Sequence, residues 1–254
     1  MFAKLTAMNL RVVTVGIIAA LAGATAGFVL ANSLNRTTIN ALKAQIDNRQ
    51  SSPQTTAPGQ GDLGVSDEEI KAKIQEADSN PTDVAFQKNL GRGLYRFAAM
   101  KRDPILIEEA KRILERAKSL DPKDFDVLVD LGNAYFDIGY FKKDAAAFKS
   151  SRESYEAAMV IKPTDANVRT EYALTFYLSE PADLKRAHEE FAKALKLDPK
   201  QERALQFTTS AYIREGDFVN ATKTIEMLKS VNPKNDSIPS LQTQIDTKTY
   251  TPTQ

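Results

Sequence analysis

Few side chains in this sequence have the types and spacing that catalysis requires. The one histidine, His188, stands in the charged stretch LKRAHEEFAKAL, where helical spacing predicts a solvent-facing position, and no nucleophile-elbow sequence accompanies it. Adjacent acids such as Glu189-Glu190 point in different directions on a helix and make no acid–base pair. The fragment GRG at 91–93 lacks the third glycine of a dinucleotide site and is better explained by helix packing. We therefore expect no catalytic residues and no enzyme activity.

The composition narrows the function classes further. The chain has 254 residues, with 34 Lys and Arg against 33 Asp and Glu, no cysteine and no tryptophan. Without cysteine there is no disulfide framework, thiolate metal cage or cysteine nucleophile, and one histidine cannot form a multi-histidine metal site. A net charge of +1 without a basic block does not concentrate nucleic acid. We expect no metal ion, no cofactor and no nucleic-acid partner.

An uncharged apolar run predicts a membrane segment near the N-terminus. After a basic tail at 1–11, residues 12–30 are VVTVGIIAALAGATAGFVL. At ~1.5 Å per residue, a helix of this length spans a hydrocarbon core of about 30 Å. The same run could be a signal peptide, because small residues at cleavage-like spacing follow a basic start. Arg11 adjoins the run whereas Arg36 lies beyond it, which favours a single-pass inner-membrane protein with a cytoplasmic N-terminus and a periplasmic C-terminal domain.

The segments in and after this run predict a tether. Ala19, Gly23 and Gly27 share one helix face, which could support a homodimer through the anchor or reflect the ordinary composition of membrane helices. Residues 33–47 keep a helical apolar spacing and predict a juxtamembrane helix. Residues 48–64 are rich in Gln, Ser, Thr, Pro and Gly, a composition typical of a disordered linker.

Repetition organises the rest of the chain. A capping box predicts a leading helix over 65–80, and prolines then recur at intervals of 41, 41, 36 and 34 residues, at Pro81, Pro122, Pro163, Pro199 and Pro233. A small–large–small pattern precedes each of the last four prolines, with Leu228 its one larger departure: Ala110, Leu114, Ala117; Ser151, Tyr155, Ala158; Ala187, Phe191, Ala194; Ala221, Ile225, Leu228. This pattern predicts antiparallel helix pairs, in which small residues allow close approach and proline ends the second helix.

The register resembles the tetratricopeptide repeat (TPR). The resemblance covers 81–233 and implies an all-α, right-handed superhelical array of about four helix pairs, with a capping helix and tail at 234–254. The units would be 81–122, 122–163, 163–199 and 199–233. The tryptophan often found early in the family's first helix is missing. The first two units carry seven extra residues (41 against 34), which alignment of both ends places between the two helices, around 98–107 and 140–149.

The resemblance also implies a concave groove that is lined by the first helices and binds a partner polypeptide. Residues four, seven, eleven and fourteen after each proline would face it: Ala85, Lys88, Arg92, Tyr95, Asp126, Val129, Asn133, Phe136, Asn167, Thr170, Leu174, Tyr177, Arg203, Gln206, Ser210 and Ile213. The aromatic row of Tyr95, Phe136 and Tyr177 could hold a peptide, or it could simply support packing within the repeats.

One specific binding mode of this family does not fit the sequence. A subset of cytosolic co-chaperones grips a C-terminal carboxylate with a basic clamp across several first helices. Lys88 fits such a clamp, but Asp130 and Glu171 occupy inward-leaning positions and would repel the ligand. We therefore do not expect carboxylate-clamp binding.

Together these features favour a membrane-tethered scaffold or adaptor that binds a protein partner outside the cytoplasm. The chain is also similar to envelope proteins with one N-terminal span and an exported repeat array. These include the ancillary subunit of the bacterial Sec translocon and the repeat-containing cytochrome c maturation proteins. The alternative of another class is a structural subunit of a membrane complex. Many unrelated functions share the repeat register, so it does not choose between these alternatives.

Overall fold

The structure is a computed structural model that describes residues 65–251. The predicted membrane segment at 12–30, with Ala19, Gly23 and Gly27, lies outside the described residues, as do the predicted segments at 33–47 and 48–64. All regular structure in the described part is helical, so the all-α prediction is confirmed there. None of these described helices has both the length and the apolar character needed to cross a bilayer.

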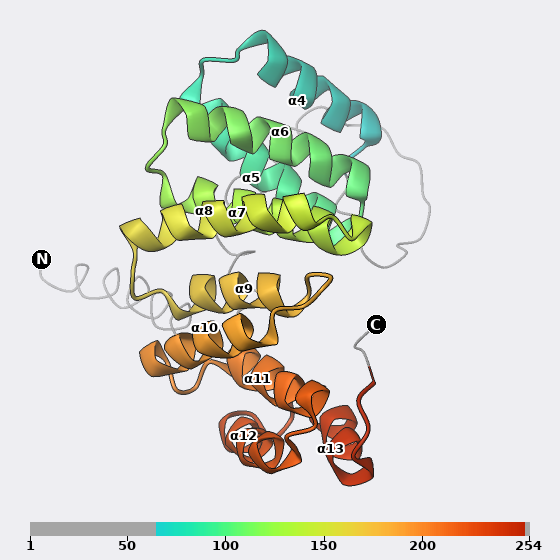
Figure 1. The fold of residues 1–254 in the computed structure, drawn as a ribbon. Coiled ribbons are helices and arrows are strands. Elements are labelled where there is room, and N and C mark those ends of the chain that lie inside the picture. The colour runs from blue at the N-terminus through green and yellow to red at the C-terminus, as the bar shows by residue number, and fades with distance from the viewer. Residues whose placement is uncertain (1–64, 252–254) are drawn as a thin grey trace, which may run out of the picture. The chain divides into compact units, whose positions relative to one another are not determined.

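Ten helices within residues 65–251 follow one another as packed neighbours. Helix α4 (Asp67–Ser79) precedes four pairs, and α13 (Ile238–Thr247) follows them. The pairs are α5 (Val84–Lys101) with α6 (Pro104–Leu120), α7 (Phe125–Lys142) with α8 (Ala145–Ile161), α9 (Ala166–Tyr177) with α10 (Leu184–Leu197), and α11 (Glu202–Glu215) with α12 (Phe218–Val231). The two helices of a pair contact each other most extensively, and the stack follows chain order from α4 to α13 (Figure 1).

Aspartate begins most of these helices. At the N-cap of three first helices, Asp83, Asp124 and Asp165 each accept a hydrogen bond from the backbone N–H three residues on. Asp103 and Asp144 do the same for α6 and α8. Each carboxylate satisfies an N–H group that has no partner within its helix. At the other end, a repeat proline directly follows the C-cap residue of each second helix and ends it.

The small–large–small positions of the second helices form the core of each pair. None of these twelve side chains is more than 2% exposed, which confirms the packing predicted from the sequence. Helices α7 and α8 pack tightly at Gly132, where an added Cβ atom would lie 2.5 Å from Cε1 of Tyr155. The ring of Tyr155 therefore fills the space that a side chain at 132 would need.

The seven extra residues of the first two units lie inside the helices. Helices α5 and α7 have 18 residues each and α6 and α8 have 17, whereas α11 and α12 have 14 each. The connections within the long units are only Arg102-Asp103 and Lys143-Asp144. The prediction of lengthened segments between the helices is therefore wrong. Seven residues make about two helical turns, so dividing them between two helices keeps both buried faces in phase.

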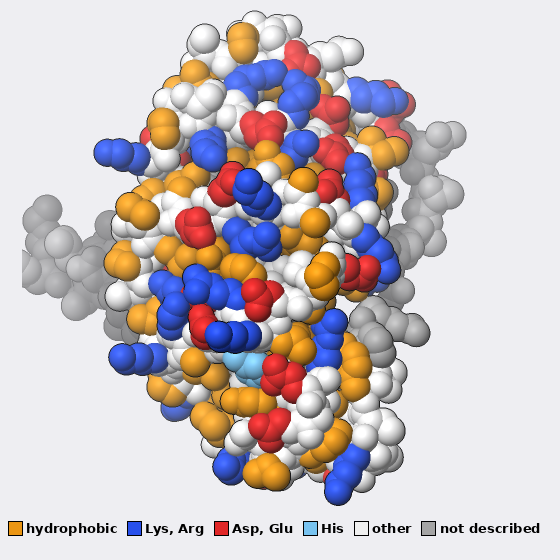
Figure 2. All heavy atoms as spheres, in the orientation of Figure 1, with side chains coloured by type: hydrophobic (Ala, Val, Ile, Leu, Met, Phe, Trp, Pro, Cys, Tyr) orange, Lys and Arg blue, Asp and Glu red, His pale blue; other side chains and the backbone are white. Residues whose placement is uncertain are grey.

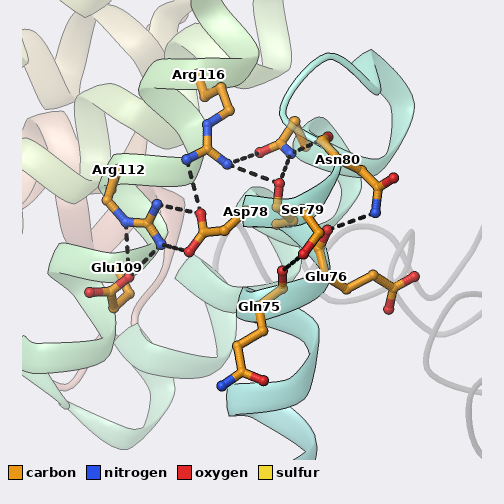
Figure 3. A network of polar contacts seen from close by, with 10 residues as sticks. Gln75, Glu76, Asp78, Ser79, Asn80, Glu109, Arg112 and Arg116 are labelled. Atoms are coloured by element: carbon orange, nitrogen blue, oxygen red, sulfur yellow. Dashed lines mark hydrogen bonds and ion pairs between the residues drawn. The ribbon is translucent and has the colours of Figure 1, made fainter.

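Polar contacts attach α4 to the first pair (Figure 3). Asp78 accepts hydrogen bonds from Arg112 at 2.6 and 3.1 Å and from Arg116 at 2.9 Å. These guanidinium groups, Arg112 foremost, hold the pKa of Asp78 below its usual value. The side-chain amide of Gln87 donates to the Ala77 carbonyl at 2.7 Å. Because Asp78 is on the surface, this attachment is a polar one at the edge of the array.

Apolar contacts attach α13 to the last pair. Leu241 and Ile245 are buried in a cluster with Ile213, Ile225 and Leu228 of α11 and α12. Both end helices therefore bury two apolar residues, Ile70 and Ala77 on α4 and Leu241 and Ile245 on α13, and α4 adds charged hydrogen bonds at the surface.

Candidate partner-binding face

The first helices α5, α7, α9 and α11 share one side of the array. Each contacts the first helix of the next unit, and α11 contacts α13 in the same way. Within residues 65–251, consecutive second helices have no contact of comparable extent. A stack whose elements are closer on one side is curved toward that side, so the first helices lie on the concave side. We call the surface of these four helices the first-helix face.

Ion pairs join α5 to α7 across this face. Lys88 pairs with Asp124, and Arg92 pairs with Asp126 at 3.0 Å and with Asp130 at 2.8 Å. The Asp130 side chain is only 9% exposed, and burial raises its pKa although Arg92 donates to it. The basic residues that the sequence placed at this end of the groove are therefore neutralised by the next helix.

Polar contacts of a second set join α9 to α11. The Arg203 guanidinium lies 2.8 Å from the Glu171 carboxylate, Gln201 donates to Asn167 at 2.8 Å, and the Tyr177 and Ser210 hydroxyls are 2.7 Å apart. Glu171 and Asp130, the two acids that argue against a carboxylate clamp, are thus each paired with an arginine of this face. A partner carboxylate would have to displace them.

The aromatic row of the predicted groove is packed inside the array. Tyr95 and Phe136 are each 9% exposed and Tyr177 is 1% exposed. The Tyr95 hydroxyl donates to Asp137 at 3.0 Å, and the Phe136 ring meets Phe148 edge to face with centroids 5.7 Å apart. The burial agrees with the second of the two sequence interpretations, in which these rings support packing.

The remaining predicted groove residues divide into buried and accessible ones. Thr170 and Leu174 are fully buried, Ile213 is 1% exposed, Val129 packs against the cluster around Tyr155, and Asn133 accepts a hydrogen bond from the Tyr155 hydroxyl at 2.7 Å. The predicted residues that remain accessible on the first-helix face are Ala85, Lys88, Asp126, Asn167, Arg203 and Gln206.

Asp137 on α7 is a residue of this face that the sequence reasoning missed. It accepts the Tyr95 hydrogen bond, and burial raises its pKa from 3.8 to about 6, with the nearby charge of Glu171 adding to the increase. Its repeat position offered a signal: fifteen residues after successive prolines the sequence has Arg96, Asp137, Leu178 and Arg214. Charged residues thus occupy this repeat position in three of the four units. A position inside the apolar core would not show that pattern, so it indicated a polar site on the first-helix face.

A small pocket lies at the C-terminal end of the first-helix face. Its volume is about 190 Å³, and it lies between α11 and the α13 region, lined by Gln206, Phe207, Ser210, Asp236, Ser237, Ser240, Leu241 and Gln244. Gln206 and Ser210 are predicted groove residues. The segment after α13 returns to this end, where the Thr251 N–H donates to the Gln244 side chain at 2.8 Å. Amide and hydroxyl groups of this kind suit hydrogen bonding to a peptide backbone.

Comparisons with solved structures identify the architecture. The chain is similar to a crystal structure of the MamA protein, with 17% identity, coverage of 80% of this chain and 93% of that chain, and a TM-score of 0.54. It is also similar to TTC0263, described as a thermophilic TPR protein of Thermus thermophilus, with 15% identity, coverage of 84% and 98%, and a TM-score of 0.53. The fold is a TPR fold. No protein-family model and no curated protein matches the sequence.

The candidate catalytic residues have structural roles in this TPR array. His188 is 19% exposed, its ring lies 4.4 Å from that of Tyr212, and Nε2 is 2.9 Å from the Glu215 carboxylate. The side chain that the sequence predicted to face solvent is thus partly exposed, because α11 covers part of the ring. A Cβ on Gly91 would meet Leu114 at 3.0 Å, as the helix-packing explanation of that fragment requires. Within residues 65–251 there is no group of three His, Asp or Glu side chains arranged to hold a metal ion.

The surface charges of the TPR array are mixed. On the side shown in Figure 2, acidic and basic side chains alternate over the whole surface, and no large patch has one sign. Such a surface discriminates between partners by the local arrangement of charges rather than by a long-range field.

Proposed function

We propose that this chain is a TPR adaptor that binds a partner polypeptide on its first-helix face. The accessible groove residues carry this proposal, since Asp126, Asn167, Arg203 and Gln206 line the side where successive units meet. Beside Gln206, the pocket offers amides and hydroxyls to a peptide backbone. Backbone hydrogen bonds would supply affinity, and the paired charges would select the sequence of the partner.

The proposal includes a tether to the inner membrane. Residues 12–30 would form a single-pass anchor with the N-terminus in the cytoplasm, and the linker at 48–64 would carry the array in the periplasm. A tethered array binds a membrane-proximal partner at a raised effective concentration. Ala19, Gly23 and Gly27 would allow two anchors to pair in a homodimer.

Narrower roles follow from the same tethered architecture. As an accessory subunit of cytochrome c maturation or of the Sec translocon, the array would present a client polypeptide to an enzyme or channel partner. It has no cysteine with which to perform thiol chemistry itself. A structural subunit of a membrane complex would use the same surfaces without releasing a client. In each of these roles the chain binds and does not catalyse.

Site-specific crosslinking in membranes tests the binding face. A photoreactive amino acid would be placed in the full chain at Asn167 or Gln206, with Ala192 of α10 and Ser230 of α12 as exposed controls on the second helices of the same units. We expect Asn167 and Gln206 to capture the same protein and the controls to capture none. Capture from the second-helix positions alone would overturn the proposed face.

Substitution and protease protection extend this test. Asn167→Arg and Gln206→Arg place large charges on the face without removing a core side chain, so they should lower capture by about tenfold, whereas Ser230→Arg should not. Protection of the TPR array from protease added to sealed inside-out vesicles of the inner membrane, which enclose the periplasmic face, would support the periplasmic location, and digestion would contradict it.

A further inference from the structure

The turns that join the helices of the two long units have the same exposed residue pattern. The first turn presents Met100, Lys101 and Arg102, and the second presents Phe141, Lys142 and Lys143 at positions 41 residues later. Each triplet has one apolar residue followed by two cations. Aligned on their C-cap residues, the short units have Phe176, Tyr177 and Leu178, or Arg214, Glu215 and Gly216, and neither triplet has an apolar residue followed by two cations. The pattern is therefore confined to the two units that carry the extra helical turns.

The apolar side chains of these turns are unusually exposed. Ile105 is 75% exposed, Met100 48%, Phe141 46% and Tyr140 42%. Tyr140 and Phe141 pack edge to face on one another, with ring centroids 5.8 Å apart. Scattered exposed apolar residues are ordinary on a protein surface, but four within two matched turns are a patch with a function to explain.

The two turns lie on one edge of the array. The Lys142 ammonium group at the end of α7 is 2.6 Å from the Glu108 carboxylate near the start of α6, so the α7–α8 turn lies beside the α5–α6 turn. We call residues 100–105 together with 140–143 the long-unit edge. Neither pocket described for residues 65–251 is lined by these residues, so the edge offers protruding side chains rather than a cleft.

Four exposed cations lie on the long-unit edge. Lys101 and Arg102 form no ion pair with residues 65–251, and the side chains of Lys142 and Lys143 are 51% and 73% exposed. The nearby acids are already engaged: Asp103 and Asp144 cap helices. Glu108 binds Lys142 and Lys111, and Glu180 binds Lys143 at 3.2 Å. The exposed ion pairs of Lys142 and Lys143 are weak, so these cations can exchange a carboxylate for a phosphate.

We propose that the long-unit edge docks on the surface of an anionic phospholipid bilayer. Aromatic and aliphatic side chains beside Lys and Arg are the residue types that favour the level of the lipid headgroups. Tyr140, Phe141, Met100 and Ile105 enter that level, while the four cations bind lipid phosphates. The contact is independent of the predicted anchor at 12–30 and leaves the accessible groove residues Asn167 and Gln206 free for a partner.

Tryptophan fluorescence tests this contact directly, because the natural chain has no tryptophan. The full chain with Phe141→Trp is reconstituted with vesicles that contain phosphatidylglycerol and a phosphatidylcholine brominated in its acyl chains. Val219→Trp, on an exposed site of α12 in the short units, is the matched control. We expect a blue-shifted emission and at least about twofold quenching at position 141, and no quenching at position 219.

The charge requirement is tested by lipid composition and by substitution. Quenching at 141 should be lost in vesicles of phosphatidylcholine alone, and also in a chain with Lys101→Gln, Arg102→Gln, Lys142→Gln and Lys143→Gln. The same four neutralisations at Lys185, Lys196, Lys223 and Lys234 should leave it intact.

Three results would overturn the proposal. One is equal quenching in neutral and anionic vesicles, and another is equal quenching at 141 and 219. The third is a blue shift at 141 without bromolipid quenching, which would show that a second copy or another protein covers the edge. Partner capture at Asn167 and Gln206 is measured separately, so failure of the lipid contact does not alter the result for the first-helix face.

Discussion

The long half of the array, α5–α8, and the short half, α9–α12, stabilise the same helix-pair unit in different ways. In the long half, the nearly buried Asp130 lies between Arg92 and Arg96, and Gly132 lets the ring of Tyr155 lie against the α7 backbone. In the short half, the acid at the repeat position of Asp130 is Glu171, which pairs with Arg203 of the following unit, an arginine that is 48% exposed. The positions matching Gly132 are Ala173 and Thr209, both of which carry a Cβ atom.

This difference shows what the repeat requires and what it leaves free. The buried small–large–small positions are kept in all four units, whereas helix length, the glycine and the burial of the charged pair vary between the halves. A unit thus needs its internal core, while the polar contacts between units, which add to the apolar ones, can be either buried or exposed.

Removing the paired acid should give the largest difference in stability loss between the two halves, with Asp130 of the long half costing more than Glu171 of the short half. Asp130→Ala would leave Arg92 and Arg96, 17% and 16% exposed, without their buried partner, and should lower the free energy of unfolding by about 3 kcal/mol. Glu171→Ala leaves the exposed Arg203 in contact with water and should cost less than about 1 kcal/mol. Urea unfolding of the full chain, followed by circular dichroism, measures both. Asp126→Ala, which removes the exposed partner of Arg92, is the control, and equal losses for all three would contradict the contrast.

Replacing Gly132 of α7 should lower the free energy of unfolding somewhat less than removing Asp130. Gly132→Ala puts a Cβ atom into the ring of Tyr155 and should cost about 2 kcal/mol, because the buried ring cannot move freely. The reverse exchange in the short half, Ala173→Gly, should cost about 1 kcal/mol through helix propensity. Hydrogen exchange of the α7 and α8 amides measures the local effect of Gly132→Ala. A neutral or stabilising Gly132→Ala would show that the approach of these helices is not as close as described.

Asp137 of the long half should make the stability of the chain depend on pH. Burial raises its pKa from 3.8 to about 6 in the folded chain, so folding favours the protonated acid. That stability is fully present below pH 3.8 and is lost as the pH rises through about 6. Asp137→Asn keeps an acceptor for Tyr95 and removes this loss, so its stability relative to the natural chain should rise by about 1–2 kcal/mol between pH 4 and pH 8.

Urea midpoints at several pH values measure this effect. Tyr95→Phe removes a hydrogen bond that favours the ionised acid, so it should move the inflection above about 6. A parallel pH dependence in Asp137→Asn and the natural chain would exclude Asp137 as the responsible group.

The smallest effect is expected at the end of the array. Asp78→Ala removes the hydrogen bonds from Arg112 and Arg116 at a surface site and should cost less than about 1 kcal/mol. Faster hydrogen exchange should be confined to α4, because Ile70 and Ala77 are its only buried residues. A loss of protection that reaches α7 would show that the polar attachment of α4 stabilises the whole long half.

Local rules explain why much of the fold was predictable from the sequence. The repeat prolines, the aspartates that follow them and the small–large–small spacing each act within one helix or one pair, so Tyr155 and Phe191 could be assigned to the core without knowing their neighbours. The extra residues at 98–107 were misplaced for a related reason. An insertion of about two turns has the same effect on the spacing of the flanking patterns whether it extends the helices or the loop between them.

The first-helix face was harder to predict because exposure there depends on the crossing of separate helices. Arg92 and Asp130 are 38 residues apart, and nothing in their own helices indicates that one will neutralise the other. The same reason applies to two other residues that residues of α11 cover. The sequence left open whether Tyr177 packs or binds, and it did not predict the contact of His188 with α11. The exposure of a residue that points toward the next unit can therefore be assigned only from the structure. The burial of a residue that faces the other helix of its own pair can be assigned from the sequence.

The ion pairs of the first-helix face also have a mechanical consequence. Straightening the curved array would move α5 away from α7 and α9 away from α11, which would stretch the pairs of Arg92 and Arg203. On the opposite side, consecutive second helices within residues 65–251 make no contact of comparable extent. We therefore expect these charge pairs to add to the resistance of the array to straightening, and the contribution of the exposed pairs should fall as rising ionic strength screens them.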